Sequence, residues 1–187
     1  KKTGTRNVSH LGGLFKRMPV TAIAAIIALL SMSGLPPMLG FIGKELIYEA
    51  KVQLGGLGNF VLILGVFSNV FMVWVSGLIA YRVFFGRVRK GLTGNLEPSF
   101  SLLAGPVILS LFSLILGLAP GMFGEMIIEP ALIASRIEIL DIKLKLWHGF
   151  NIVFFLSLAT LTMGILFFFL SPKLIPVFRR MNDRFFN

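Results

Sequence analysis

The chain has 187 residues, of which 56% are hydrophobic and 14% charged, and its mean hydropathy is +0.87. A soluble domain interrupts its apolar runs with charge far more often, so this composition excludes a soluble domain and predicts an all-α integral membrane protein. The absence of cysteine excludes disulfides, thiolate metal sites and cysteine-ligated iron–sulfur clusters, and two histidines and eight acidic residues leave little material for a metal centre. No nucleophile motif, phosphate loop or haem-ligand pair occurs, so we predict no cofactor and no bound metal.

The formal net charge of +10 fits either nucleic acid or anionic lipid headgroups, and its distribution along the chain decides between them. Four uncharged runs each reach the ~20 residues that a spanning helix needs. Thirteen of the 18 basic residues lie in segments 1–17, 82–97 and 173–187, whereas six of the eight acidic residues lie in 44–59 and 125–148. This positive-inside pattern predicts four spans with both ends cytoplasmic, and it indicates lipid rather than nucleic acid as the partner.

In chain order, the sequence divides into cytoplasmic, membrane and outer segments. The predicted segments are a basic cytoplasmic segment (1–17), a broken transmembrane helix (18–50), a transmembrane helix with a basic cytoplasmic loop (51–97), a transmembrane helix (98–124), an outer amphipathic segment (125–148), a transmembrane helix (149–172) and a basic cytoplasmic tail (173–187). The outer segment reads as amphipathic because apolar residues recur there against charged ones.

The first span contains three helix-breaking residues, Gly34, Pro36 and Pro37. Proline lacks a backbone donor and clashes with the preceding turn, so the helix must kink or end here. A simple kink is one alternative. Two short separate spans are another, but they would place the basic segments 1–17 and 82–97 on opposite sides. We therefore predict a true discontinuity, whose freed backbone groups need new partners or a wet cavity inside the protein.

Lys44 follows this break, with Glu45 beside it. An ammonium group in or near the hydrocarbon layer is costly, and a broken membrane helix followed by an ionisable residue indicates an ion or proton path. The alternative is a lysine that extends to the outer headgroups and pairs with Glu45 or Glu49. Spacing alone leaves these interpretations equal. Tyr48 lies four residues further on and shares the helix face of Lys44.

The second span carries a polar residue, Asn69, near its middle. Such a side chain bonds a neighbouring helix more often than it binds water. We therefore expect Asn69 to hydrogen-bond to another span.

Three stretches resemble a known family. They are Gly12-Gly13-Leu14, Met18-Pro19 and the stretch SMSGLPPMLGFIGKE from Ser31 to Glu45. The sequence is similar there to the large antiporter-like membrane subunits shared by respiratory complex I and the Mrp multisubunit cation/proton antiporters. Residues 40–50 and 146–151 resemble the A-type subunits of the Mrp branch more closely than the subunits of the complex I branch.

The resemblance implies that the break at Gly34, Pro36 and Pro37 is the late discontinuous helix of the second inverted repeat. It also implies that Lys44 belongs to the proton-transfer chain, toward its outer exit. Glu45 is then the neighbouring carboxylate that tunes the pKa of Lys44.

The leading functional prediction is a part of a secondary transporter subunit, not an enzyme, that exchanges Na⁺ for H⁺ in the plasma membrane. One alternative is the redox-driven proton-pumping subunit of complex I. Another is a structural membrane scaffold in which Lys44 only reaches the headgroups. The chain has no initiator Met and resembles only the end of the family's core. Its expected partners are therefore the preceding part of the same chain, the other subunits of a hetero-oligomeric complex and the bilayer.

Overall fold

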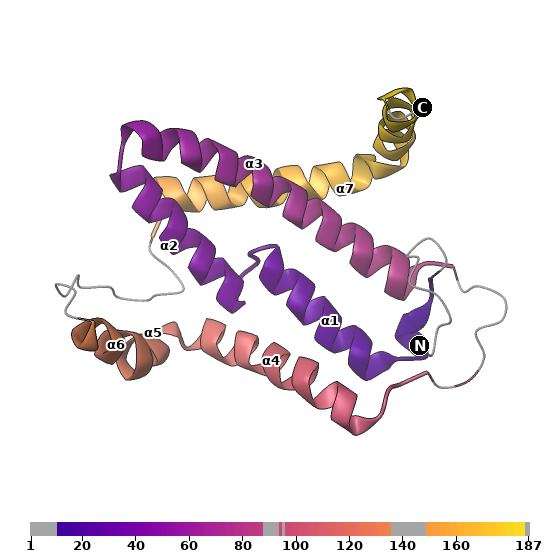
Figure 1. The fold of residues 1–187 in the computed structure, drawn as a ribbon, viewed down its shortest axis with the longest axis horizontal. Helices are drawn as coiled ribbons and strands as arrows, with labels where there is room; N and C mark the ends of the chain where they lie inside the picture. The colour runs from indigo at the N-terminus through magenta and orange to yellow at the C-terminus, as the bar shows by residue number, and fades with distance from the viewer. Residues whose placement is uncertain (1–10, 88–93, 95, 136–148, 186–187) are drawn as a thin grey trace.

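The computed structural model describes residues 11–87, 94, 96–135 and 149–185. Within these ranges every regular element is a helix and no strand occurs, so the predicted all-α fold is confirmed (Figure 1). The elements are a 3₁₀ turn (Leu14–Lys16), α1 (Pro19–Met32), α2 (Leu39–Gln53), α3 (Gly56–Ile79) with a π-helical continuation (Ala80–Phe85), α4 (Phe100–Leu118), α5 (Pro120–Phe123), a π-helical turn (Gly124–Ile128), α6 (Glu129–Ala134) and α7 (Ile152–Phe185).

Three of the described helices are long and apolar enough to cross a membrane: Gly56–Phe85, Phe100–Leu118 and the Ile152–Pro172 part of α7. The first predicted span is divided between α1 and α2, which have 14 and 15 residues and are each too short to cross alone. The two halves follow one another in the same direction (Figure 1). The predicted discontinuity is therefore confirmed, with the break between Met32 and Leu39.

The spans alternate in direction along the chain (Figure 1). The start of α1, the end of α3, the start of α4 and the end of α7 lie together at one end of the bundle, here called the terminal end. The end of α2 and the short helix α6 lie at the opposite end, here called the α6 end. This alternation is what four spans require when the first of them is broken once.

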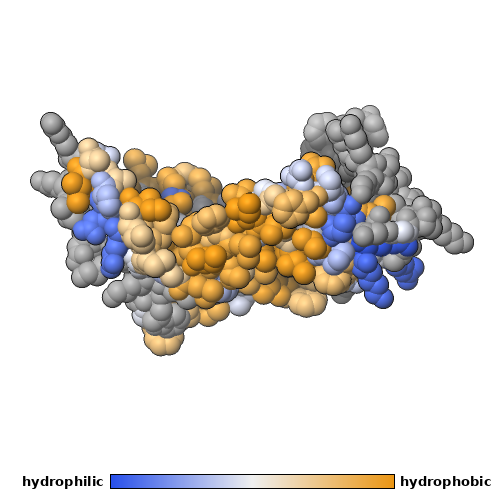
Figure 2. All heavy atoms as spheres, turned by 90° about the horizontal axis from the view of Figure 1, so that it is seen from below, coloured by the Kyte–Doolittle hydropathy of each residue, from blue (hydrophilic) through white to orange (hydrophobic). Residues whose placement is uncertain are grey.

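The middle of the bundle presents apolar side chains to its surroundings. Figure 2 shows a hydrophobic band across the molecule, with hydrophilic residues gathered toward both ends. Large apolar residues are accordingly exposed on the outer faces of the spans, for example Phe67 on α3 and Leu102 on α4. Contact with lipid chains explains such a surface, since lipid tails do not penalise exposed hydrocarbon.

Two glycines bring α3 and α7 close together. A Cβ on Gly77 would lie 3.1 Å from the ring of Phe168, and one on Gly164 would meet the side chain of Val73. Small residues allow membrane helices to approach in this way. The α3–α7 pair is the most extensive helix contact in the described structure, followed by α1 with α4.

The connection that precedes α4 is fastened to the start of α1 through Glu97. Its carboxylate accepts hydrogen bonds from the backbone N–H groups of Val20 (2.7 Å) and Thr21 (3.1 Å) and from the Thr21 hydroxyl (2.8 Å). Helix N-termini leave N–H groups unpaired and favour negative charge, so Glu97 acts as a cap supplied from a distant part of the chain. The N–H of Leu96 adds a bond to the carbonyl of Arg17 (3.1 Å).

The end of α7 differs from the prediction, and the predicted outer segment lies partly outside the described residues. Helix α7 has 34 residues and continues to Phe185, beyond the predicted end of the span at 172. Its final part turns away from the axis of the span (Figure 1). In the predicted outer segment, helical structure covers 124–134, and residues 136–148 lie outside the described ranges. The amphipathic helix there stays a prediction.

Single-cysteine labelling tests the proposed sidedness of the two ends, since the chain has no cysteine of its own. Ser99→Cys places an exposed thiol at the start of α4, at the terminal end, and Ser135→Cys places one beyond α6. In intact membranes we expect Ser99→Cys to react with a membrane-impermeant maleimide only from the cytoplasm and Ser135→Cys only from outside. Labelling of both thiols from the same side would contradict this topology.

Candidate proton-transfer site at the helix break

The break begins with a defined helix ending at Gly34. The N–H of Leu35 donates to the carbonyl of Leu30 (3.1 Å), and the N–H of Gly34 donates to the carbonyl of Ser31 (3.0 Å). This pair of bonds is a Schellman motif, which needs a left-handed residue at its centre. Gly34 adopts that conformation with φ of 66°. The two following prolines cannot continue the helix, so α1 and α2 become separate segments.

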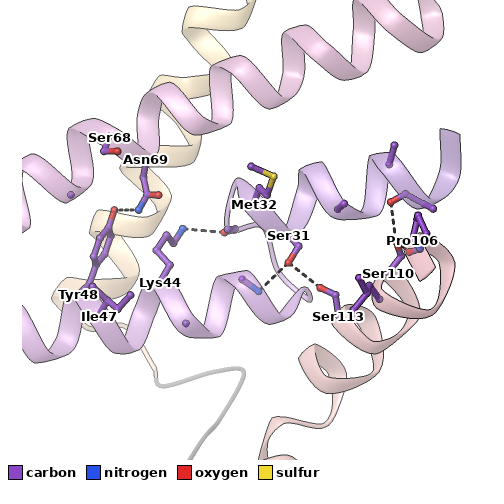
Figure 3. A pocket seen from close by; sticks show the side chains of 18 of the residues that line it. Ser31, Met32, Lys44, Ile47, Tyr48, Ser68, Asn69, Pro106, Ser110 and Ser113 are labelled. Carbon is purple, nitrogen blue, oxygen red and sulfur yellow. Dashed lines mark hydrogen bonds between the residues drawn. The ribbon is translucent and has the colours of Figure 1, made fainter. Parts of the chain in front are cut away.

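The carbonyl freed by the break is occupied by Lys44. The Nζ atom of Lys44 donates a hydrogen bond to the carbonyl oxygen of Gly34 at 3.0 Å (Figure 3). The lysine side chain is 7% exposed and reaches back toward the break rather than onward to the α6 end. The same Nζ lies 5.4 Å from the centre of the Phe41 ring, within the range of a cation–π contact.

Gly34 contributes space as well as backbone freedom. A Cβ at this position would lie 2.9 Å from Cδ, 3.1 Å from Cε and 3.1 Å from Nζ of Lys44. Only the absence of a side chain lets the lysine stem lie against the backbone there. Gly34 therefore both terminates the helical path of α1 and leaves room for the Lys44 ammonium group.

Glu45 is buried beside the lysine, with 8% of its side chain exposed, and interacts electrostatically with Lys44. Glu49, the other carboxylate considered from the sequence, is exposed. The structure thus brings Lys44 and Glu45 together at the break and leaves Glu49 at the surface.

A cavity of about 1040 Å³ extends along α1, α2, α3 and α4, and Lys44 lies on its wall (Figure 3). Its polar lining includes side chains from all four helices: Ser31, Lys44, Tyr48, Lys51, Asn69 and Ser113. A space of this size with several polar partners can hold water. The break therefore opens on a cavity whose mainly apolar wall carries polar groups from four helices.

Ser31 joins three helices on the other side of the break. Its Oγ accepts a hydrogen bond from the Ser113 hydroxyl of α4 (2.9 Å) and another from the backbone N–H of Gly40 in α2 (3.2 Å). A Cβ on Gly40 would meet the Ser31 carbonyl, and one on Gly117 of α4 would meet the Pro37 carbonyl. These glycines let α2 and α4 press against the break.

Sequence reasoning missed this support from α4, although a signal was present. Ser110, Ser113 and Gly117 are spaced by three and four residues and share one face of an uncharged span. Small and hydroxyl residues in that pattern are typical of a packed membrane-helix interface. The Ser110 hydroxyl lies 3.0 Å from the Ala24 carbonyl, which extends the α1–α4 contact toward the terminal end.

Asn69 bonds a neighbouring helix, as its position predicted. Its Nδ2 donates to the hydroxyl of Tyr48 at 2.6 Å, which links α3 to α2 (Figure 3). Tyr48 is 1% exposed, and its ring packs with Leu62 and Val153.

Replacing Pro36 and Pro37 together by alanine tests whether the break itself is needed. Alanine restores the missing backbone donors and helix propensity, and this draws the Gly34 carbonyl toward a helical partner and away from Lys44. We expect transport by the intact complex to fall on the order of tenfold, which corresponds to about 1.4 kcal/mol. The measurement is ion-driven proton movement in vesicles, with assembly checked on native gels. Unchanged transport would mean that the prolines only bend the span.

The described residues thus form a helical membrane segment in which a buried lysine lies at a break between two helices, bonded to a backbone carbonyl on the wall of a cavity. Broken helices that line a cavity and carry ionisable groups are a feature of secondary transporters in general.

Comparison with known proteins shows what the chain is similar to. Residues 1–72, which include the break and Lys44, match the family described as NADH:quinone oxidoreductase/Mrp antiporter, TM. Over 98% of its length the chain is 29% identical to the A subunit of the Na(+)/H(+) antiporter of Alkalihalophilus pseudofirmus, of which it covers 25%. Over 88% of its length it is 33% identical to the A1 subunit of the Na(+)/H(+) antiporter of Staphylococcus haemolyticus, of which it covers 22%.

A solved structure agrees with these relatives. The chain superposes on one polypeptide of the Mrp complex from Dietzia sp. DQ12-45-1b with a TM-score of 0.72 and 29% identity, covering 99% of its own length and 20% of that polypeptide. The resemblance to the A-type subunits of the Mrp antiporters that the sequence predicted is therefore confirmed. The chain spans about a quarter of the length of the curated relatives it matches.

Proposed function

We propose that this chain is part of the membrane subunit of a monovalent cation/proton antiporter that exchanges Na⁺ for H⁺, and that Lys44 is a proton-transfer residue within it. One observation carries the proposal: the Lys44 ammonium is buried at a break between two helices, 3.0 Å from a freed backbone carbonyl and on the wall of a cavity that also carries polar groups. A purely structural lysine gains nothing from such a position, since a charge inside the membrane is expensive.

The geometry suits a group that changes its charge. A neutral lysine amine can take a proton from water in the cavity, and both its neutral and charged forms have N–H groups to donate to the Gly34 carbonyl. Glu45, buried next to it, is the proposed carboxylate partner that balances the ammonium form. Lys44 thus keeps its hydrogen bond to the Gly34 carbonyl in both charge states.

The proposed setting is the plasma membrane, with the terminal end of the bundle cytoplasmic. The excess of basic residues in segments 1–17, 82–97 and 173–187 supports this orientation. The proposed partners are the rest of the same polypeptide and the other subunits of a hetero-oligomeric complex. The length of the relatives that this chain does not cover supports the first, and the superposition on one polypeptide of an Mrp complex supports the second.

A second candidate is the proton-pumping subunit of complex I, which the description of the matched family also includes. The two functions differ in what drives the protons. Inverted vesicles that contain the parent complex are preloaded with a pH gradient, and Na⁺ is then added without NADH or quinone. We expect Na⁺ to collapse the gradient. Proton movement that requires NADH and quinone, and is indifferent to Na⁺, would overturn the antiporter proposal.

A further inference from the structure

The cavity wall continues beyond Lys44 along the same face of α2. Tyr48 and Lys51 follow at four and seven residues and both line the cavity. At a rise of ~1.5 Å per residue, Lys44 and Lys51 are separated by roughly 10 Å along the helix axis. Lys51 lies two residues before the end of α2 at Gln53, so this row runs from the break to the α6 end of the bundle.

Tyr48 lies between the two lysines and its hydroxyl has a fixed orientation. The phenol oxygen accepts a hydrogen bond from Asn69 Nδ2 at 2.6 Å, while the ring is buried against Leu62 and Val153. A hydroxyl that accepts from an amide still has its own hydrogen to donate. Asn69 therefore directs the hydroxyl hydrogen elsewhere, without itself being able to titrate.

Lys51 is half-buried, and its Nζ lies against α3 at Gly65. A Cβ on Gly65 would lie 3.0 Å from that Nζ and 3.8 Å from Cε1 of Tyr48. Gly65 thus leaves room for the ammonium group against the α3 backbone. Among the described residues that line the cavity, the charged ones are the two lysines, Lys44 and Lys51.

We propose that Tyr48 and Lys51 continue the proton path from Lys44 to the α6 end of the bundle, with Asn69 and Gly65 as positioning residues. This inference rests on the proposed function of Lys44. In the transfer, an N–H bond of the Lys44 ammonium breaks and its proton passes through cavity water to the Tyr48 oxygen. The former O–H bond of Tyr48 breaks as its proton passes through cavity water to the Lys51 amine. Lys44 ends neutral, Tyr48 is unchanged and Lys51 becomes the ammonium that releases its proton to solvent.

The competing interpretation is structural. Tyr48 and Asn69 would then only join α2 to α3, and Lys51 would only extend toward the headgroups. Substitutions that keep shape or charge but remove proton transfer separate the two. Tyr48→Phe keeps the ring and removes the hydroxyl. Lys51→Arg keeps the positive charge, but a guanidinium does not release its proton in proteins.

The test measures Na⁺-driven proton exchange by the intact complex in vesicles, with assembly on native gels as the readout of structure. We expect Tyr48→Phe, Lys51→Arg and Lys51→Gln each to lower the exchange rate on the order of tenfold or more with normal assembly. We also expect imidazole, a small mobile proton carrier, to restore part of the Lys51→Gln rate when it is added on the α6 side. The same addition is expected to leave a Lys44→Arg variant inactive.

Two glycine variants provide a matched pair. Gly65→Ala adds a methyl group where the Lys51 ammonium lies, whereas Gly105→Ala adds one on an exposed face of α4, outside the cavity and with no atom within 4 Å. We expect Gly65→Ala to slow exchange severalfold and Gly105→Ala to leave it unchanged. Normal exchange in both Tyr48→Phe and Lys51→Arg, with Lys44→Arg inactive, would overturn this inference and leave the proposed function standing. Normal exchange in all three would overturn both.

Discussion

Replacing Lys44 by arginine is expected to reduce cation/proton exchange by at least about a hundredfold, the usual effect of losing a positioned proton donor and acceptor. Arginine keeps the positive charge but does not release a proton at working pH. It is also larger, and the atoms of Lys44 from Cδ to Nζ already lie within about 3 Å of the space that a Gly34 side chain would fill. The Lys44→Ala variant should lose transport too, and it leaves the Gly34 carbonyl without its lysine donor, at a cost of about 1–3 kcal/mol.

The measurement is Na⁺-dependent dissipation of a pH gradient in vesicles, with assembly followed on native gels. Lys16→Arg is the matched control, because it makes the same substitution at an exposed lysine outside the cavity. We expect the control to transport normally and both Lys44 variants to assemble. If Lys44→Arg transports like the unmodified complex, a fixed positive charge is sufficient and the relay role is wrong. Full transport by Lys44→Ala would favour the scaffold interpretation.

Replacing Gly34 by alanine is the second change with a large expected effect. It alters the space that the Lys44 side chain occupies without removing the lysine. The left-handed conformation of Gly34 costs alanine roughly 1–2 kcal/mol. The added methyl group also displaces the Lys44 side chain from the Gly34 carbonyl. We expect exchange to fall on the order of tenfold or more, since about 1.4 kcal/mol of lost stabilisation corresponds to a factor of ten.

Gly34→Asn separates the two causes in this second prediction. Asparagine tolerates the left-handed region better than alanine, but its Cβ meets the same Lys44 atoms. Comparable transport losses in Gly34→Ala and Gly34→Asn would identify the displaced lysine as the cause, and a milder loss in Gly34→Asn would identify backbone strain. Gly105→Ala again supplies the control. Normal transport in Gly34→Ala would show that the Lys44–Gly34 contact is not used.

The sequence was sufficient for those features that depend on local chemistry. Gly34, Pro36 and Pro37 predicted the break because their effects on the backbone are intrinsic, and the polarity of Asn69 predicted an interhelical bond. The orientation of Lys44 could not be predicted, because a side chain near a helix end has room to extend either way. In the structure, Lys44 points back to the Gly34 carbonyl, and the position of this carbonyl depends on how α1 and α2 are offset.

Contacts between distant segments were also beyond sequence reasoning. The Ser31–Ser113 bond and the approach of Gly117 to Pro37 join residues about 80 positions apart, and no local pattern pairs them. Glu97 at the start of α1 is a similar case, because its partners Val20 and Thr21 lie more than 70 residues away. The continuation of α7 past Pro172 was missed because proline marks a boundary only on average.

Both halves of the broken span contact α3 and α4, but their side-chain hydrogen bonds to these neighbours differ. Glu97, Ser110 and Ser113 bond α1 to α4 and its preceding loop, whereas Tyr48 bonds α2 to α3. The Lys44–Gly34 hydrogen bond joins the two halves directly across the break. A change in the tilt of α2 relative to α1 would therefore alter the 3.0 Å distance between the lysine nitrogen and this carbonyl.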